Sequence, residues 1–226
     1  MSARELWADG ERTLGTALGR LVPADYAGPS LLPDWSRAHV LGHLAGNADA
    51  LVNLLAWART GVETPMYASP EARNAEIARR AALDPAALEA EVLTSTRRLA
   101  EAVAGLPEQA WAAQVRTAQG RTVPASEVLG MRAREVWVHA VDLDAGVSFA
   151  DVPAEVLTDV VDEVFAAWDR RGDTPALTLF ADGREWGSGE PAVAGSLPDV
   201  AGWVSGRTAG QGLRADGPLP ALPRWV

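Results

Sequence analysis

The apolar residues in the first two thirds of the chain recur every three or four positions, which is the spacing of one helix face. Residues from about 3 to 21 form the first predicted helix, which ends before Pro23. A second predicted helix begins at Asp34 or Ser36, either of which can cap it, and it stops at Gly61.

A long excursion over residues 62–82 separates the second predicted helix from the third. Its length favours a lid or a binding segment over a simple connection. Pro85 opens the third predicted helix, which ends before Gly105. A fourth begins at Pro124 and runs toward Gly146, and four such helices predict a bundle whose core can hold a site.

The pattern changes near residue 150. Residues 153–169 still have helical spacing, whereas residues 176–181 alternate as a strand does. A second extended stretch at 192–195 precedes a short helix over 198–205. These are the elements of a small mixed domain rather than a continuation of the bundle.

We therefore predict an α+β, multidomain fold. Residues 1–150 would form a four-helix bundle and residues 151–226 a small α+β domain. The sequence contains no internal repeat and no low-complexity tract.

Composition narrows the function classes further. The formal net charge of -10 argues against a nucleic-acid partner, because phosphate binding needs clustered basic residues. No run of about 18 apolar residues occurs, and the N-terminus lacks the parts of a signal peptide, so we expect a cytoplasmic protein with no membrane partner. We also expect a monomer. There is no cysteine, so any sulfur chemistry must use another molecule's thiol.

Three polar residues on the predicted helices form a candidate metal site. Glu135 and His139 are four residues apart on the fourth helix and share one face. His43 lies on the second helix, whose apolar residues direct it toward the bundle interior. Two histidines and one carboxylate, with a position left open, form a ligand set typical of catalytic zinc. The alternative is that these three residues make ordinary buried or surface contacts and bind no metal.

His39 competes with His43 for this assignment. It lies four residues before His43 on the same predicted helix, so the two histidines also have a spacing suited to a metal. The tryptophans, among them Trp35 and Trp137, are interpreted as core or interface anchors.

Several stretches carry a likeness that goes beyond metal spacing: SRAHVLGH at 36–43, TPMY at 64–67, TAQGRTVPASE at 117–127, REVWVHAVDL at 134–143 and PRW at 223–225. Together they resemble the mycothiol-dependent maleylpyruvate isomerase family over nearly the whole chain. The resemblance implies a DinB-like four-helix bundle, a small C-terminal α+β domain and the zinc ligands His43, Glu135 and His139. It leaves His39 as a packing or supporting residue.

The resemblance also implies a reaction, the conversion of maleylpyruvate to fumarylpyruvate in gentisate-type aromatic degradation, with zinc and mycothiol as cofactors. Reversible addition of a thiol beside a carbonyl makes the cis double bond temporarily single, so that it can rotate. Zinc removes the proton of a thiol that it coordinates.

A substrate with two carboxylates needs local positive charge in an acidic protein, and arginine can bind a carboxylate through two hydrogen bonds. Arg73 lies in the long excursion, and the resemblance suggests that it faces the metal. Arg207 follows the short C-terminal helix and could reach the site from the second domain. A solvated surface role is the alternative for each.

Two other functions stay open: a mycothiol S-transferase acting on other electrophiles, and a non-catalytic metal-binding module. The stretches 64–67 and 117–127 favour the isomerase, because they match it beyond the metal site.

Overall fold

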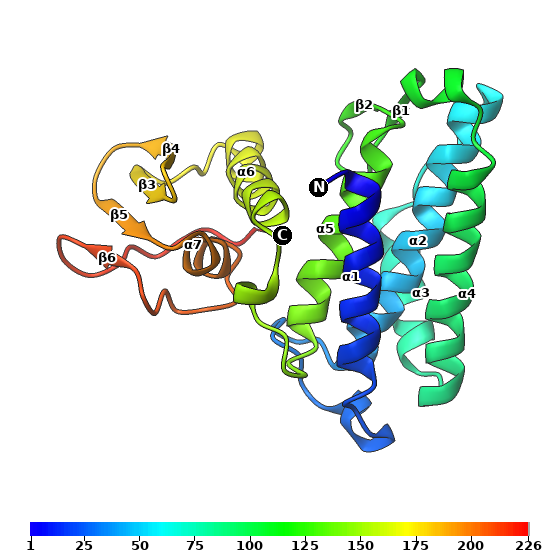
Figure 1. Cartoon of the computed structure of the whole chain (residues 1–226), viewed down its shortest axis with the longest axis horizontal. Helices are drawn as coiled ribbons and strands as arrows, with labels where there is room; N and C mark the ends of the chain where they lie inside the picture. Colours follow the sequence, from blue (N-terminus) through cyan, green and yellow to red (C-terminus); the bar gives the residue numbers. More distant parts are fainter. Residues whose placement is uncertain (226) are drawn as a thin grey trace. The chain divides into compact units, whose positions relative to one another are not determined.

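The computed structural model describes residues 1–225 and shows an α+β protein with two compact units. One unit runs from Ser2 to Ala145, and the other comprises Met1 and the chain from Gly146 onward. Figure 1 shows the helices of the first unit, and the sheet and helices of the second. Within the described residues, no helix is long and apolar enough to cross a membrane.

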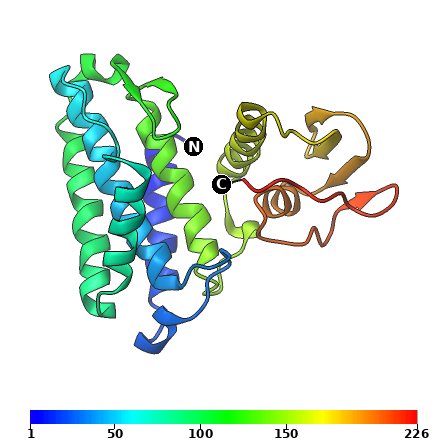
Figure 2. The ribbon, with the colours of Figure 1, turned by 180° about the vertical axis from the view of Figure 1, so that it is seen from behind.

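Five α-helices make up most of the first unit: α1 (Ala3–Leu18), α2 (Arg37–Thr60), α3 (Pro70–Ala81), α4 (Pro85–Ala104) and α5 (Glu127–Asp142). Short 3-10 turns, Pro23–Ala27 and Glu108–Ala112, connect some of them. Helix α1 packs on α5, and α2 contacts α3, α4 and α5. Figure 2 shows the same helices from behind, with α3 lying against α2.

Helix α2 lies at the centre of this unit and has the ends that the sequence predicts. Ser36 caps its start, since the Oγ atom accepts a hydrogen bond from the backbone N–H of His39 at 3.3 Å. Gly61 ends it with a φ of 74°, a conformation that glycine adopts without strain. Its buried leucines, Leu41, Leu44, Leu51 and Leu54, are each 0% exposed.

The excursion predicted over residues 62–82 is not a single long loop, because helix α3 occupies its second half. Pro70 is the first residue of α3, and Ser69 Oγ accepts a hydrogen bond from the N–H of Ala72 at 3.1 Å. Only Ile77 and Arg80 of this helix are buried, so its apolar stripe is too thin to detect by periodicity.

The predicted fourth helix starts later and ends earlier than expected. Residues up to Pro124 belong to a short hairpin of β1 (Gln114–Arg116) and β2 (Thr122–Pro124), in which Val115 pairs with Val123. Helix α5 therefore begins at Glu127 and ends at Asp142 rather than near Gly146. With one buried side chain in each, these strands are too short for a clear alternation.

The second unit combines α6 (Ala154–Arg171) and α7 (Leu197–Val204) with a four-stranded sheet ordered β4-β3-β5-β6. The strands are β3 (Leu177–Ala181), β4 (Arg184–Ser188), β5 (Ala192–Gly195) and β6 (Arg214–Ala215). Strands β3 and β5 are parallel and the other pairs antiparallel. Helix α7 contacts β3 and β5, and α6 contacts β4. The four elements predicted here are confirmed, whereas β4 and β6 were not predicted.

Candidate functional site

Three side chains from α2 and α5 converge in the helical unit. His43 Nε2 lies 2.8 Å from Glu135 Oε2, and His139 Nε2 lies 3.3 Å from the same oxygen. One potential ligand atom from each residue lies within 4.8 Å of the others. The helix spacing predicted that these three residues share one location, and the structure brings them together.

Burial and mutual charge set the protonation of this cluster. Burial lowers the pKa of His43. The negative charge of Glu135 acts to raise this pKa, but it offsets the effect of burial only in part. Burial acts to raise the pKa of Glu135, but the two histidines outweigh it and hold that pKa well below its usual value. Burial acts to lower the pKa of His139, but hydrogen bonds to Asp142 and Glu135 prevail and raise it. The cluster therefore contains an ionised carboxylate flanked by two imidazoles.

Asp142 holds His139 from behind. Its carboxylate is 0% exposed, and Oδ2 lies 2.8 Å from His139 Nδ1. This contact leaves His139 Nε2 directed at Glu135 and fixes the orientation of the imidazole, as carboxylates do behind metal-binding histidines. Asp142 was not predicted from the sequence, although its position three residues after His139 in the same helix was a usable signal.

The donor set fits a divalent metal. Two imidazole nitrogens and one carboxylate oxygen are ligands that zinc accepts, and three protein ligands leave a fourth position for a small molecule. Both histidines are buried and Glu135 is half-buried, so the donor atoms meet at one partly accessible point.

The other histidine of α2, His39, contacts the cap at the start of the helix. His39 Nδ1 lies 2.7 Å from Ser36 Oγ, within the cap at the start of the helix. His39 is not part of the converging group. Its position is that of a supporting residue at the helix end.

Trp35 forms one wall beside the cluster. Its ring centre lies 5.7 Å from that of His43, with the planes inclined at 67°. The side chain is half-buried, in contrast to Trp137, which is buried among the helices. Trp137 is a core anchor, as predicted for the tryptophans, whereas the prediction of a core or interface anchor did not include the position of Trp35 beside His43.

Arg73 brings positive charge to the cluster from the first turn of α3. Its Nη2 atom lies 3.3 Å from His43 Nδ1, and its guanidinium carbon lies 5.8 Å from the ring centre of Tyr67. Within residues 1–225, no carboxylate forms an ion pair with it, whereas Arg80 on the same helix pairs with Asp49 at 2.7 Å. Arg73 is therefore placed to receive an external anion.

Arg207 belongs to the second unit, where it follows α7. Its Nη1 atom donates a hydrogen bond to the backbone oxygen of Ser205 at 2.8 Å, and its guanidinium carbon lies 5.2 Å from the ring centre of Trp225. Arg171 donates a hydrogen bond to the Trp225 carbonyl at 3.0 Å, so the tail that carries this ring is held to α6. A role for Arg207 in catalysis stays a prediction.

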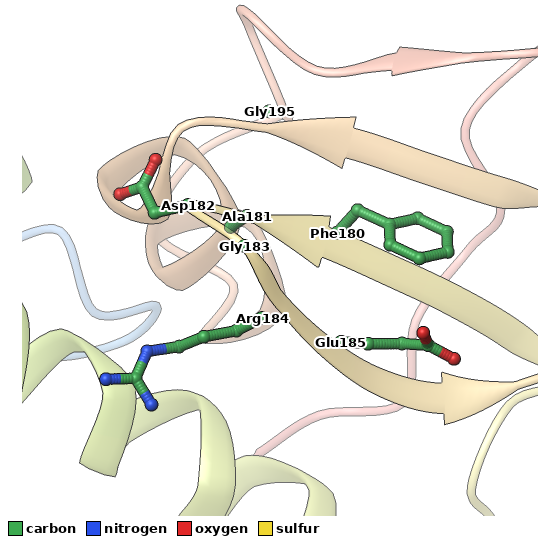
Figure 3. A pocket seen from close by; sticks show the side chains of 7 residues that line it. All are labelled: Phe180, Ala181, Asp182, Gly183, Arg184, Glu185 and Gly195. Carbon is green, nitrogen blue, oxygen red and sulfur yellow. The ribbon is translucent and has the colours of Figure 1, made fainter.

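A hollow at the turn between β3 and β4 is a weaker candidate for a functional site (Figure 3). It is lined by Phe180, Asp182, Arg184 and Glu185 together with small residues. No cluster of potential metal ligands occurs there in the part of the chain that the structure describes. The helical unit therefore holds the better site.

The fold and the cluster define a two-unit α+β protein with a His–Glu–His group, in which the histidines are buried and the glutamate is half-buried. Residues 7–144 match the family model of the mycothiol maleylpyruvate isomerase N-terminal domain. A crystal structure of the mycothiol-dependent maleylpyruvate isomerase is 41% identical, covers 99% of this chain and 95% of that chain, and has a TM-score of 0.94. A histidine-to-alanine mutant of that isomerase is 40% identical, with the same coverage and TM-score.

No curated protein shows a significant match. The chain belongs to the mycothiol-dependent maleylpyruvate isomerase family and is an enzyme of that family.

Proposed function

We propose that the protein is a zinc- and mycothiol-dependent cis–trans isomerase that converts maleylpyruvate to fumarylpyruvate in gentisate-type aromatic degradation. The observation that carries this proposal is the convergence of His43, Glu135 and His139 in a chain that is 41% identical to the isomerase over 99% of its length. On this proposal the helical unit is a DinB-like four-helix bundle, with α3 added to it.

His43, Glu135 and His139 would hold the metal. When bound there, zinc with an open position would lower the pKa of a mycothiol thiol, and the thiolate would add reversibly to the substrate so that its cis double bond can rotate. The chain has no cysteine, which is consistent with a thiol brought by a second molecule.

The protein's own residues would prepare this site before any ligand arrives. Glu135 stays ionised, and Asp142 keeps the Nε2 atom of His139 directed at the cluster. The burial of His43 and His139 would lower the local dielectric constant, which strengthens the electrostatic contacts that these side chains make.

Arg73 would bind a carboxylate of the substrate and stabilise negative charge that develops on the keto acid during addition. The location of Arg73 supports this role. Its Nη2 atom lies 3.3 Å from His43 Nδ1, and it forms no ion pair with a carboxylate among residues 1–225. Arg207 would contribute a second positive charge from the C-terminal domain. We propose that this domain comprises residues 151–226. We propose a cytoplasmic monomer.

The direct test is conversion of maleylpyruvate by the purified protein, with the product identified by NMR. We expect fumarylpyruvate to form with zinc and mycothiol present, to stop after treatment with a chelator, and to resume when zinc is restored. A stable mycothiol adduct would instead identify the protein as an S-transferase. If the protein binds zinc but catalyses no reaction, it would be a non-catalytic metal-binding module.

A further inference from the structure

The segment that precedes α3 is fixed from two sides. Asn53 on α2 donates its Nδ2 hydrogens to the backbone oxygens of Pro65 and Met66, at 3.2 and 3.4 Å. The N–H of Ala118 lies 3.2 Å from Met66 Sδ, and the Met66 side chain is 7% exposed. Tyr67 follows directly, so its backbone is held against α2 and the hairpin connection.

The ring of Tyr67 in turn lies next to Arg73. The guanidinium carbon is 5.8 Å from the ring centre, a distance at which an aromatic face attracts a cation. Arg73 also donates from Nη1 to Asn74 Oδ1 at 3.2 Å, while its Nη2 atom lies 3.3 Å from His43 Nδ1. An arginine side chain has many rotamers, so these contacts select one that keeps the charge at the site.

An aromatic ring suits this task better than a carboxylate does. A carboxylate would neutralise the guanidinium that an anionic ligand needs, whereas a neutral ring attracts the cation and leaves its charge uncompensated. Burial raises the pKa of Tyr67, so the phenol stays neutral and adds no negative charge of its own.

We propose that Tyr67 is a positioning residue, whose ring holds the Arg73 guanidinium beside His43 so that it can receive a substrate carboxylate. The identity of that carboxylate rests on the proposed function. The placement of Arg73 by Tyr67 does not.

The kinetic test compares ring removal with hydroxyl removal. We expect Tyr67→Leu to lower kcat/KM for maleylpyruvate on the order of 10-fold, mainly through KM, with zinc content unchanged. Tyr67→Phe keeps the ring and should stay within about 3-fold of the wild type. Tyr26 is the only other tyrosine in the sequence, and its hydroxyl bonds to Glu89, so Tyr26→Phe is the matched control and should be unchanged.

A double-mutant cycle separates positioning from general packing. If Tyr67 acts through Arg73, Tyr67→Leu should cost almost nothing further in an Arg73→Ala background. A loss of the same size in both backgrounds would mean that Tyr67 acts independently of Arg73, and the inference would be wrong.

Crystal structures of the zinc-loaded wild type and the zinc-loaded Tyr67→Leu variant test the positioning of Arg73 independently of enzyme activity. We expect the Arg73 side chain to lie beside His43 in the wild type and to leave that position in the leucine variant. An Arg73 that keeps its position without the ring would overturn the inference. If the wild type fails to convert maleylpyruvate, the proposed function fails, but this structural comparison still stands as the test of positioning.

Discussion

At the scale of single residues, His43 and His39 present a matched pair on one helix. Only His43 converges with Glu135 and His139, while His39 bonds to the cap residue Ser36. We expect His43→Ala to lose bound zinc and His39→Ala to keep most of it, because a three-ligand site rarely survives the loss of one ligand. Metal analysis of the purified variants measures this, and full zinc occupancy in His43→Ala would exclude the assignment.

Asp142 gives a second prediction at this scale. Asp142→Asn removes the charge behind His139 and should weaken zinc binding roughly 10- to 100-fold, the usual effect of losing a partner behind a metal ligand. Competition against a chelator measures the affinity. Asp144→Asn is the control, since Asp144 is exposed two residues further on and should bind zinc like the wild type. Equal affinities for both variants would show that Asp142 is not needed.

The sequence predicted that His43, Glu135 and His139 come together, but it did not predict which residues surround them. Glu135 and His139 are linked by helix geometry, which any four-residue spacing reveals. Trp35 and Tyr67 lie outside the α-helices and β-strands, and they contact His43 and Arg73, which follow them by eight and six residues near the start of a helix. No local pattern encodes such contacts, so they became visible only in the structure.

At the scale of elements, helix ends were predictable where a cap marks them. Ser36 and Gly61 define α2, and Pro85 begins α4. Helix α3 was missed because few of its apolar residues are buried, and its buried Arg80 instead pairs with Asp49 of α2 at 2.7 Å and with Glu91 of α4 at 3.3 Å. A pattern search for apolar stripes passes over a helix held in this way.

The close approach of α3 and α2 depends on Gly42. A Cβ atom placed there would lie 3.0 Å from the backbone oxygen of Ile77 and 3.1 Å from Arg80 Cβ. We expect Gly42→Ala to push α3 away, to destabilise the protein by about 1–3 kcal/mol and to reduce activity by moving Arg73.

The matched control is Gly15→Ala in α1, where nothing lies within 4 Å of the added atom. That change should be neutral or stabilise by roughly 0.5–1 kcal/mol, because alanine favours the helix. Denaturant unfolding compares the two variants. Gly42→Ala and Gly15→Ala of equal stability would contradict the close helix contact.

At the scale of the whole molecule, the protein is acidic, and so is the substrate that we propose for it. The net charge is -10, so attraction has to come from individual arginines rather than from the overall field. Arg73 supplies one such charge at the cluster, and the proposal assigns a second to Arg207 of the C-terminal unit.

Arg207→Ala should therefore lower kcat/KM on the order of 100-fold, since a desolvated charge-assisted contact contributes about 3 kcal/mol. Arg207→Lys should restore little, because lysine cannot form the paired hydrogen bonds of a guanidinium. Zinc content should not change in either variant. Arg214→Ala, at an exposed arginine of the same unit, is the control. Wild-type kinetics in Arg207→Ala would assign Arg207 to the protein surface.

The most direct test of the central claim is a count of mycothiol before and after many turnovers. An isomerase that uses reversible thiol addition releases the thiol in every cycle, so a small amount of mycothiol should support conversion of a large excess of maleylpyruvate. Free thiol should be recovered in full at the end, with fumarylpyruvate as the product. Loss of one mycothiol for each substrate converted, with the sulfur retained in the product, would contradict the account and show a transferase.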